Sequence, residues 1–226
     1  VAVTDTKPAH TGTLFEMDEQ AGRITAVSVD GFRLAMRREK AAIPQNATFI
    51  VPGKTLSEIT KLLKDDDKLV SVSLSKKHIV FEIAGYLVIS RLLDGEFLDY
   101  KNAIPKNSTT TVTVSVREMV ESIERVSLLI TDRLKSPVRC EFSENEIHLS
   151  SATTIGKATD SFSCKLEGSP VEIGFNNKYL LDALKACQSD QVKLELSGPL
   201  APMKVVPMDG DSFLFLVLPV RLKNEN

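Results

Sequence analysis

One supersecondary pattern occurs twice in this chain, and any fold must accommodate both copies. In the first half, a predicted strand over 48–52 leads into a helix over 54–63. In the second half, a strand over 171–175 leads into a helix that begins near Lys178. Each helix opens with a lysine, Lys54 or Lys178, and then carries apolar residues at helical spacing. We therefore expect two related units, each mixing helix and strand.

The segments around these helices repeat as well. After each helix a polar turn leads into an alternating strand, over 69–74 in the first copy and 192–197 in the second, whose period of two predicts one buried face. Upstream of each strand and helix, a hairpin is predicted, over 13–28 and 139–150. The acidic turn at 64–68 lacks the spacing of a calcium loop, so we interpret it as a solvated connection.

The second copy has an additional strand and helix at its start. A strand is predicted over 110–114, and the helix from Ser115 to about Ile130 opens with a capping box of Ser115 and Glu118. The first copy has no equivalent. We therefore expect an N-terminally incomplete unit at 1–105, followed by a whole unit at 106–226. An intact unit would place both helices on one face of an antiparallel sheet, which is an α+β fold.

The most apolar run of the chain, 213–222, lies almost at its end. A continuous apolar run predicts a strand buried on both faces, and Pro219 ends it because proline cannot donate to the ladder. The short tail after Pro219 is both apolar and cationic, and the polar residues 223–226 are expected to fray. The tail is either a ragged terminus or one wall of an apolar groove, and both interpretations remain open at this point.

Composition limits the class of protein. The chain is 42% hydrophobic and 26% charged, as in soluble globular proteins, and no apolar run approaches a membrane span of about 18 residues. A net charge of -2 argues against a generally adhesive polycation, although a local basic surface remains possible. Cys140, Cys164 and Cys187 are widely spaced without a CxxC pair. We expect reduced thiols in a cytoplasmic protein, with no disulfide and no metal site.

No arrangement of residues in the sequence indicates catalysis. Asp30, Asp94, Asp99, His78 and His148 are scattered over strands and turns, without a nucleophile elbow, a phosphate loop or a metal-ligand pair. Two of the aspartates lie in predicted turns, where hydrogen bonding to the local backbone explains them. A sequence-specific DNA reader is also disfavoured, because no helix-turn-helix or zinc-finger pattern is present. We expect no catalytic residue and no cofactor.

Several motifs resemble the bacterial DNA polymerase III beta subunit, the sliding clamp family. In chain order they are DGFRLA at 30–35, IVPGK at 50–54, SRLLDGEFLDY at 90–100, IGFN at 173–176, YLLDAL at 179–184 and LPVRL at 218–222. The likeness spans nearly the whole chain. It implies a subunit of three repeats, and two such subunits close head to tail into a ring around duplex DNA. This chain would hold most of the middle repeat and all of the last.

The resemblance also implies a function. A sliding clamp is a processivity factor that holds DNA without reading its sequence and recruits the polymerase III alpha subunit, the clamp loader, other polymerases and repair proteins. These partners dock a short peptide that contains a glutamine and, a little later, a leucine and a phenylalanine. By match of position, the groove for this peptide would comprise Val29, Gly31, Phe32, Arg33, Leu34, Leu98, Asn102, Ala103, Asn176, Tyr179, Leu200, Pro202, Leu216, Leu218, Pro219, Val220, Arg221 and Leu222. The tail then has a role as one side of the groove.

Basic residues on the predicted helices are candidates for contact with DNA. A lysine at a helix start favours phosphate, because the helix N-terminus adds to its charge. For each residue the alternative is an ordinary solvated side chain. Lys54 has the best case, since its position matches a DNA-facing basic residue of the family. The full candidate set is Lys54, Lys61, Lys64, Arg117, Lys178 and Lys185.

The resemblance also implies how subunits of this family associate. Leu128, Leu129 and Ile130 match an apolar cluster through which the last repeat pairs with the first repeat of another subunit, although core packing explains the same cluster. The full-length form would be a homodimer. We expect the chain as printed to be a monomer, or a weak non-native dimer, that binds peptide without encircling DNA. The groove is expected to favour a somewhat different peptide, since three residues depart from the family's usual types: His10, Asn102 and Lys135.

Overall fold

The computed structural model describes residues 1–3, 7–64 and 68–222 of the chain. These residues divide into two compact units, Val1–Asp99 (unit 1) and Tyr100–Asn226 (unit 2). The sequence expectation placed the division after residue 105. Two predicted features, the centre of the acidic turn at 65–67 and the polar end at 223–226, lie outside the described residues.

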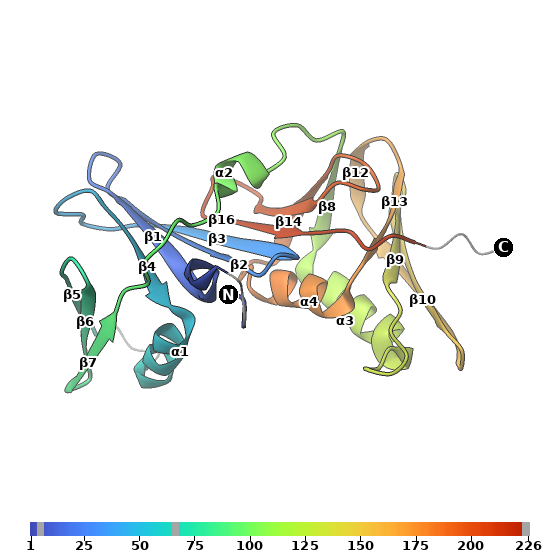
Figure 1. The fold of residues 1–226 in the computed structure, drawn as a ribbon. Coiled ribbons are helices and arrows are strands. Elements are labelled where there is room, and N and C mark those ends of the chain that lie inside the picture. The colour runs from blue at the N-terminus through green and yellow to red at the C-terminus, as the bar shows by residue number, and fades with distance from the viewer. Residues whose placement is uncertain (4–6, 65–67, 223–226) are drawn as a thin grey trace. The chain divides into compact units, whose positions relative to one another are not determined.

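Unit 1 contains two antiparallel groups of strands and one α-helix among its described residues (Figure 1). Neighbouring strands pair in the order β3-β2-β1-β4 in one group and β5-β6-β7 in the other. The helix packs over the end of the first group, where β4 runs directly into it. The elements are η1 (Pro8–Thr11), β1 (Gly12–Asp18), β2 (Arg23–Val29), β3 (Arg33–Lys40), β4 (Ala47–Pro52), α1 (Gly53–Leu62), β5 (Ser71–Leu74), β6 (His78–Ile83) and β7 (Tyr86–Arg91).

Unit 2 contains the same kinds of element and several more. Its strands pair in the order β12-β8-β14-β15-β16 in one group and β11-β10-β9-β13 in the other. The helices α3 and α4 pack against each other (Figure 1). The elements are α2 (Tyr100–Ala103), β8 (Thr110–Ser115), α3 (Val116–Val126), η2 (Ser127–Leu129), β9 (Val138–Phe142), β10 (Glu146–Thr153), β11 (Gly156–Ser163), β12 (Lys165–Gly168), β13 (Val171–Phe175), α4 (Asn177–Lys185), β14 (Gln191–Leu196), β15 (Met203–Pro207) and β16 (Phe213–Val217).

The structure confirms the internal repeat. In unit 1 the series β1, β2, β3, β4, α1, β5, β6, β7 has the same order and strand pairing as β9, β10, β11, β13, α4, β14, β15, β16 in unit 2. The strand and helix predicted only for the second copy are β8 and α3. Unit 2 therefore contains the repeated elements, the predicted strand β8 and helix α3, and also the short elements α2, η2 and β12.

The core of unit 2 lies where the inner faces of both strand groups meet the two helices. Each helix is anchored by its apolar stripe, through Met119 and Ile123 in α3 and through Leu180 and Leu184 in α4, all of which are fully buried. Burying side chains of this size stabilises the fold by about 1.5–3 kcal/mol each. The cap predicted at Ser115 is present, because its hydroxyl oxygen accepts a hydrogen bond from the Glu118 N–H at 3.3 Å.

One predicted buried face is absent from unit 1. The alternation over 69–74 predicted a half-buried strand, yet all of β5 is exposed. Its counterpart in unit 2, β14, alternates between buried and partly exposed residues and is paired on both sides, with β8 and β15. Among the described residues of unit 1, β5 pairs with β6 alone. The prediction was wrong because alternation creates a buried face only where a neighbouring element covers it.

Candidate functional site

The C-terminal tail, residues 218–222, leaves one strand group of unit 2 and joins the other. The strand β16 ends at Val217, and Val220 then pairs with Gly174 in β13. The Val220 N–H donates to the Gly174 carbonyl oxygen at 2.8 Å. Since β13 is the outer strand of the group β11-β10-β9-β13, the tail covers part of an otherwise open edge. The predicted departure of the tail from its sheet is confirmed, whereas its role in a groove remains a prediction.

Gly174 provides the space in which the tail lies. A Cβ atom at this position would stand 2.7 Å from the Val220 carbonyl oxygen and 2.6 Å from the Leu222 Cδ2 atom. Both distances are far below van der Waals contact, so a side chain here would displace the tail. A glycine inside a strand commonly marks such a close approach of another backbone.

Two groove candidates lie directly after β13. Asn176 caps α4, because its Oδ1 atom accepts a hydrogen bond from the Tyr179 N–H at 3.2 Å. The Tyr179 ring is partly buried and packs against the core of unit 2. The cap and the core packing fix both side chains at the start of α4, which follows β13 directly.

The remaining groove candidates of unit 2 differ in their exposure. Leu200, Leu218 and Val220 are exposed apolar side chains. Leu216 is buried in β16 and is only 3% exposed. Asn102 and Ala103 are exposed in α2, and Pro202 is a partly buried loop residue. Contacts with a bound peptide are therefore expected mainly from the exposed leucines and the valine.

Most groove candidates of unit 1 lie at or beside the turn between β2 and β3. The Asp30 carboxylate accepts hydrogen bonds from the Phe32 N–H at 3.1 Å and the Arg33 N–H at 3.2 Å. It also pairs with the Arg33 guanidinium, with Nε 2.7 Å from Oδ2. Gly31 adopts a φ of 84°, a conformation that glycine favours. The expectation that Asp30 serves the local backbone is confirmed.

This turn exposes some groove candidates and buries others. Phe32 is 58% exposed, which is unusual for a large aromatic side chain, and Leu98 is also exposed. Val29 and Leu34 pair across β2 and β3 and are each only 5% exposed. These two residues are core residues that hold the turn in place. His10, one of the departures from the family pattern, packs edge-on against the Phe97 ring.

The basic candidates for DNA contact fall into two groups. Within the part of the chain that the structure describes, Lys54 and Lys178 hold no ion pair, and both lie exposed in the first turn of a helix. In contrast, Lys61 Nζ lies 2.8 Å from Glu58 Oε1, and Lys185 Nζ lies 2.6 Å from Glu124 Oε1. The hydrogen bond and charge of Lys61 lower the pKa of Glu58. Lys64 is exposed next to the undescribed residues 65–67.

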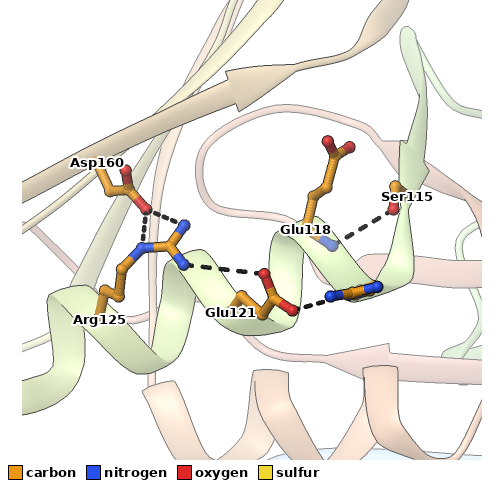
Figure 2. Close-up of polar contacts among 6 residues, drawn as sticks. Ser115, Glu118, Glu121, Arg125 and Asp160 are labelled. Atoms are coloured by element: carbon orange, nitrogen blue, oxygen red, sulfur yellow. Dashed lines mark hydrogen bonds and ion pairs between the residues drawn. The ribbon is translucent and has the colours of Figure 1, made fainter.

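The arginines on the polar face of α3 pair with acidic side chains of α3 itself and of β11 (Figure 2). Arg117 Nε donates to Glu121 Oε1 at 2.8 Å, and this contact raises the arginine pKa. Arg125 lies between Glu121 and Asp160, and its Nε donates to Asp160 Oδ2 at 2.8 Å (Figure 2). Arg117 and Lys185 therefore already have acidic partners, which a phosphate would have to displace.

The predicted ring-interface cluster is exposed in part. Leu128 is 80% exposed in η2, whereas Leu129 is partly buried and Ile130 packs against the core of unit 2. Ile155, in the turn after β10, is also exposed. The adjoining strand β11 is an outer strand of its group. Packing against the core of unit 2 thus explains an apolar side chain at Ile130, but it does not explain the exposed apolar side chain of Leu128.

The described residues contain no group of three or more His, Cys, Asp or Glu side chains that could hold a metal ion. None of the three cysteines is in a disulfide, and burial strongly raises the pKa of the Cys140 thiol and also raises that of Cys164. These thiols are therefore weak nucleophiles. Within the described residues no helix is long and apolar enough to cross a membrane.

Comparison with known proteins gives matches along nearly the whole chain. The model of the DNA polymerase III beta subunit central domain matches residues 1–99, and that of its C-terminal domain matches residues 101–221. The beta sliding clamp of Bacillus subtilis is 30% identical over 226 residues, which cover 98% of this chain and 59% of that protein. The beta sliding clamp of Staphylococcus aureus is 29% identical over 224 residues. The chain thus spans about 60% of the length of these relatives.

Solved structures give the same result. The crystal structure of the DNA polymerase sliding clamp from Bacillus subtilis matches with a TM-score of 0.94 at 30% identity, covering 99% of this chain and 60% of that one. The beta subunit from Thermotoga maritima matches with a TM-score of 0.89 at 27% identity, covering 99% and 60%. These similarities confirm the α+β clamp fold expected from the sequence.

Proposed function

Because this chain belongs to the DNA polymerase III beta subunit family, the sliding clamps, we propose that it forms part of a processivity factor in bacterial DNA replication. The single observation that carries this proposal is the match of two consecutive domain models over residues 1–99 and 101–221. The protein acts in the cytoplasm by holding and recruiting other molecules, without catalysis. In its full-length form it is a homodimeric ring that slides on duplex DNA.

The proposed binding site for partner proteins is an apolar groove that takes a short linear peptide. Apolar anchors inserted into a pocket supply most of the affinity in such sites. The exposed side chains Phe32, Leu98, Leu200, Leu218 and Val220 are the proposed contacts. Buried groove candidates such as Leu34 act by supporting the turn. Partners of this class are the polymerase III alpha subunit, the clamp loader, other polymerases and repair proteins.

The proposed contact with DNA is independent of sequence and depends on charge. Basic residues at helix starts contact phosphates, and no base is read. Lys54 and Lys178 support this role best, since no described acidic residue pairs with either side chain. Lys61, Arg117 and Lys185 contribute less while their ion pairs persist.

A second candidate function is a peptide-binding module that does not encircle DNA by itself. It is favoured by the match of this chain to a central and a C-terminal domain model, over about 60% of the relatives' length. In this form the 226-residue chain is a monomer in solution. Light scattering measures this directly, and a stable ring would contradict it.

A change at the tail tests the groove. We expect Leu218→Asp to abolish binding of a fluorescent peptide with the glutamine and leucine-phenylalanine pattern, because a bound peptide would desolvate the new carboxylate. Leu128→Asp is the matched control, since Leu128 is exposed in the same unit and is no groove candidate. Fluorescence anisotropy gives both affinities. Equal affinity for the Leu218→Asp variant and the original chain would remove the tail from the site.

A further inference from the structure

A cavity of about 410 Å³ lies beside the tail, within unit 2. One side of it is formed by Val220, Arg221 and Leu222, and another by the outer face of β9, β10 and β11. The segment before β9 adds Lys135. Val220, which pairs with Gly174 in β13, therefore also lines this cavity. Leu218 is not among the residues that line it.

The cavity is strongly cationic. Lys135, Lys157 and Arg221 line it, and none of them holds an ion pair with a described residue. A fourth lining residue, Arg139, pairs with Glu172 of the neighbouring strand. No acidic residue is among the described residues that line the cavity. Like charges gathered in a concave surface repel one another, so an anionic ligand would relieve this repulsion.

A serine of β10 also lines this space. Ser150 lines the cavity, is 6% exposed, and its side chain makes no hydrogen bond to a described residue. The adjacent residue differs, because the Ser151 hydroxyl donates to the Val126 carbonyl oxygen at 2.5 Å. The Ser150 hydroxyl proton is therefore available to an acceptor that enters the cavity.

We propose that this cavity receives the carboxylates of acidic residues that flank the peptide bound along the tail. This inference rests on the proposed function of the groove and adds the chemistry of the preferred partner. A carboxylate accepts several hydrogen bonds at once and matches both the cationic side chains and the Ser150 hydroxyl. A peptide is favoured over a nucleic acid because the tail itself borders the cavity. An extended peptide advances about 3.3 Å per residue, so a few flanking residues are enough to enter it.

The test compares three fluorescent peptides that share the glutamine and leucine-phenylalanine pattern. One carries two aspartates on its amino side, one carries them on its carboxyl side, and one carries asparagines on both sides. They are titrated at low ionic strength against the original chain and the double variant Lys135→Glu/Lys157→Glu. The matched control is Lys76→Glu/Lys77→Glu, which makes the same charge change in the exposed turn between β5 and β6 of unit 1.

We expect one acidic peptide to bind the original chain and the control variant about fivefold more tightly than the neutral peptide. The Lys135→Glu/Lys157→Glu variant should lose this preference, so that it binds the acidic peptide no more tightly than the neutral peptide. Equal binding of the acidic and neutral peptides by the original chain would overturn the cavity proposal and leave the groove intact. Failure of all three peptides to bind would overturn the groove, and this inference with it.

Duplex DNA is the competing occupant. A short labelled duplex, titrated against the same variants, distinguishes it. If the Lys135→Glu/Lys157→Glu variant lost affinity for DNA yet kept the preference for the acidic peptide, the cavity would bind DNA phosphate and not the peptide. The proposal would then be wrong. We expect the Lys135→Glu/Lys157→Glu variant to lose the preference for the acidic peptide, whether or not its affinity for DNA also changes.

Discussion

Gly174 shows how a single missing side chain can determine where a whole segment lies. Its lack of a Cβ atom lets the Val220 backbone and the Leu222 side chain approach β13. We predict that Gly174→Ala displaces the tail and weakens binding of the clamp-binding peptide about tenfold, because a backbone oxygen cannot move aside as a flexible side chain can.

A double-mutant cycle checks that this effect acts through the tail. Deletion of residues 220–226 should weaken peptide binding by a similar factor, and Gly174→Ala should then have little further effect. Fully additive losses would show that Gly174 acts elsewhere. The affinities are measured by fluorescence anisotropy, with circular dichroism confirming that each variant is folded.

Lys54 and Lys61 lie on the same helix but differ in their partners. Lys61 is paired with Glu58, whereas Lys54 holds no ion pair among the described residues. We predict that Lys54→Ala weakens binding to a short duplex and lowers the slope of log affinity against log salt by about 0.9, the contribution of one phosphate contact. Lys61→Ala is the matched control and should change the slope less. Equal slopes for both variants would contradict the assignment of Lys54.

The contact between α3 and β11 shows how an ion pair joins two elements. Burial alone would raise the pKa of Asp160, but hydrogen-bond donors that include Arg125 outweigh it and hold the pKa below its ordinary value (Figure 2). A carboxyl group with a lowered pKa in the folded state contributes stability above its ordinary pKa of about 3.9, and this contribution is lost as the pH falls through the lower folded value.

We therefore predict that Asp160→Asn reduces the dependence of the free energy of unfolding on pH between about pH 5 and about pH 3. At neutral pH the loss should be about 0.5 kcal/mol, since the pair is partly exposed. Urea unfolding followed by circular dichroism measures both quantities. Glu144→Gln, which removes an exposed carboxylate outside any described ion pair, is the control. A pH profile identical to that of the original chain would contradict the role of Asp160.

At the scale of elements, the sequence predicted most of what depends on local pattern. The cap at Ser115, the buried stripe of α3 and the repeated hairpins follow from spacing alone, and the structure contains them. The exposure of β5 did not follow, because the alternation does not reveal whether a neighbour covers the strand. The ion pairs of Lys61 and Lys185 were also missed, since they depend on which acidic side chain lies within reach.

The candidate site was predicted less completely than the fold. Positional match alone put Leu34 and Phe32 in the same set, but only the structure separates the buried leucine from the exposed phenylalanine. The contact of the tail with Gly174 could not be predicted either, because it depends on the pairing of two segments that lie far apart in the chain. The glycine inside a strand was the one signal that could have indicated it. Ser150 and Lys157 had no sequence signal, because strand register brings them to the cavity.

At the scale of the whole molecule, two units with one shared design account for the match to a central and a C-terminal clamp domain. Recognition of partners is proposed to depend on exposed apolar side chains in both units, with the tail as its best-defined part. Contact with DNA is proposed to depend on lysines at the starts of α1 and α4. Damage to the tail should therefore impair peptide binding while leaving DNA affinity intact.

Calorimetric titration of the chain with a clamp-binding peptide tests the central claim most directly. The peptide carries the glutamine and leucine-phenylalanine pattern, and its control has alanine in place of the last two residues. We predict a dissociation constant in the micromolar range, roughly 1–10 μM, for the first peptide and no measurable heat for the second. Equal binding of both peptides, or binding of neither by a chain that unfolds cooperatively on heating, would contradict the proposal that this chain presents a sliding clamp's peptide groove.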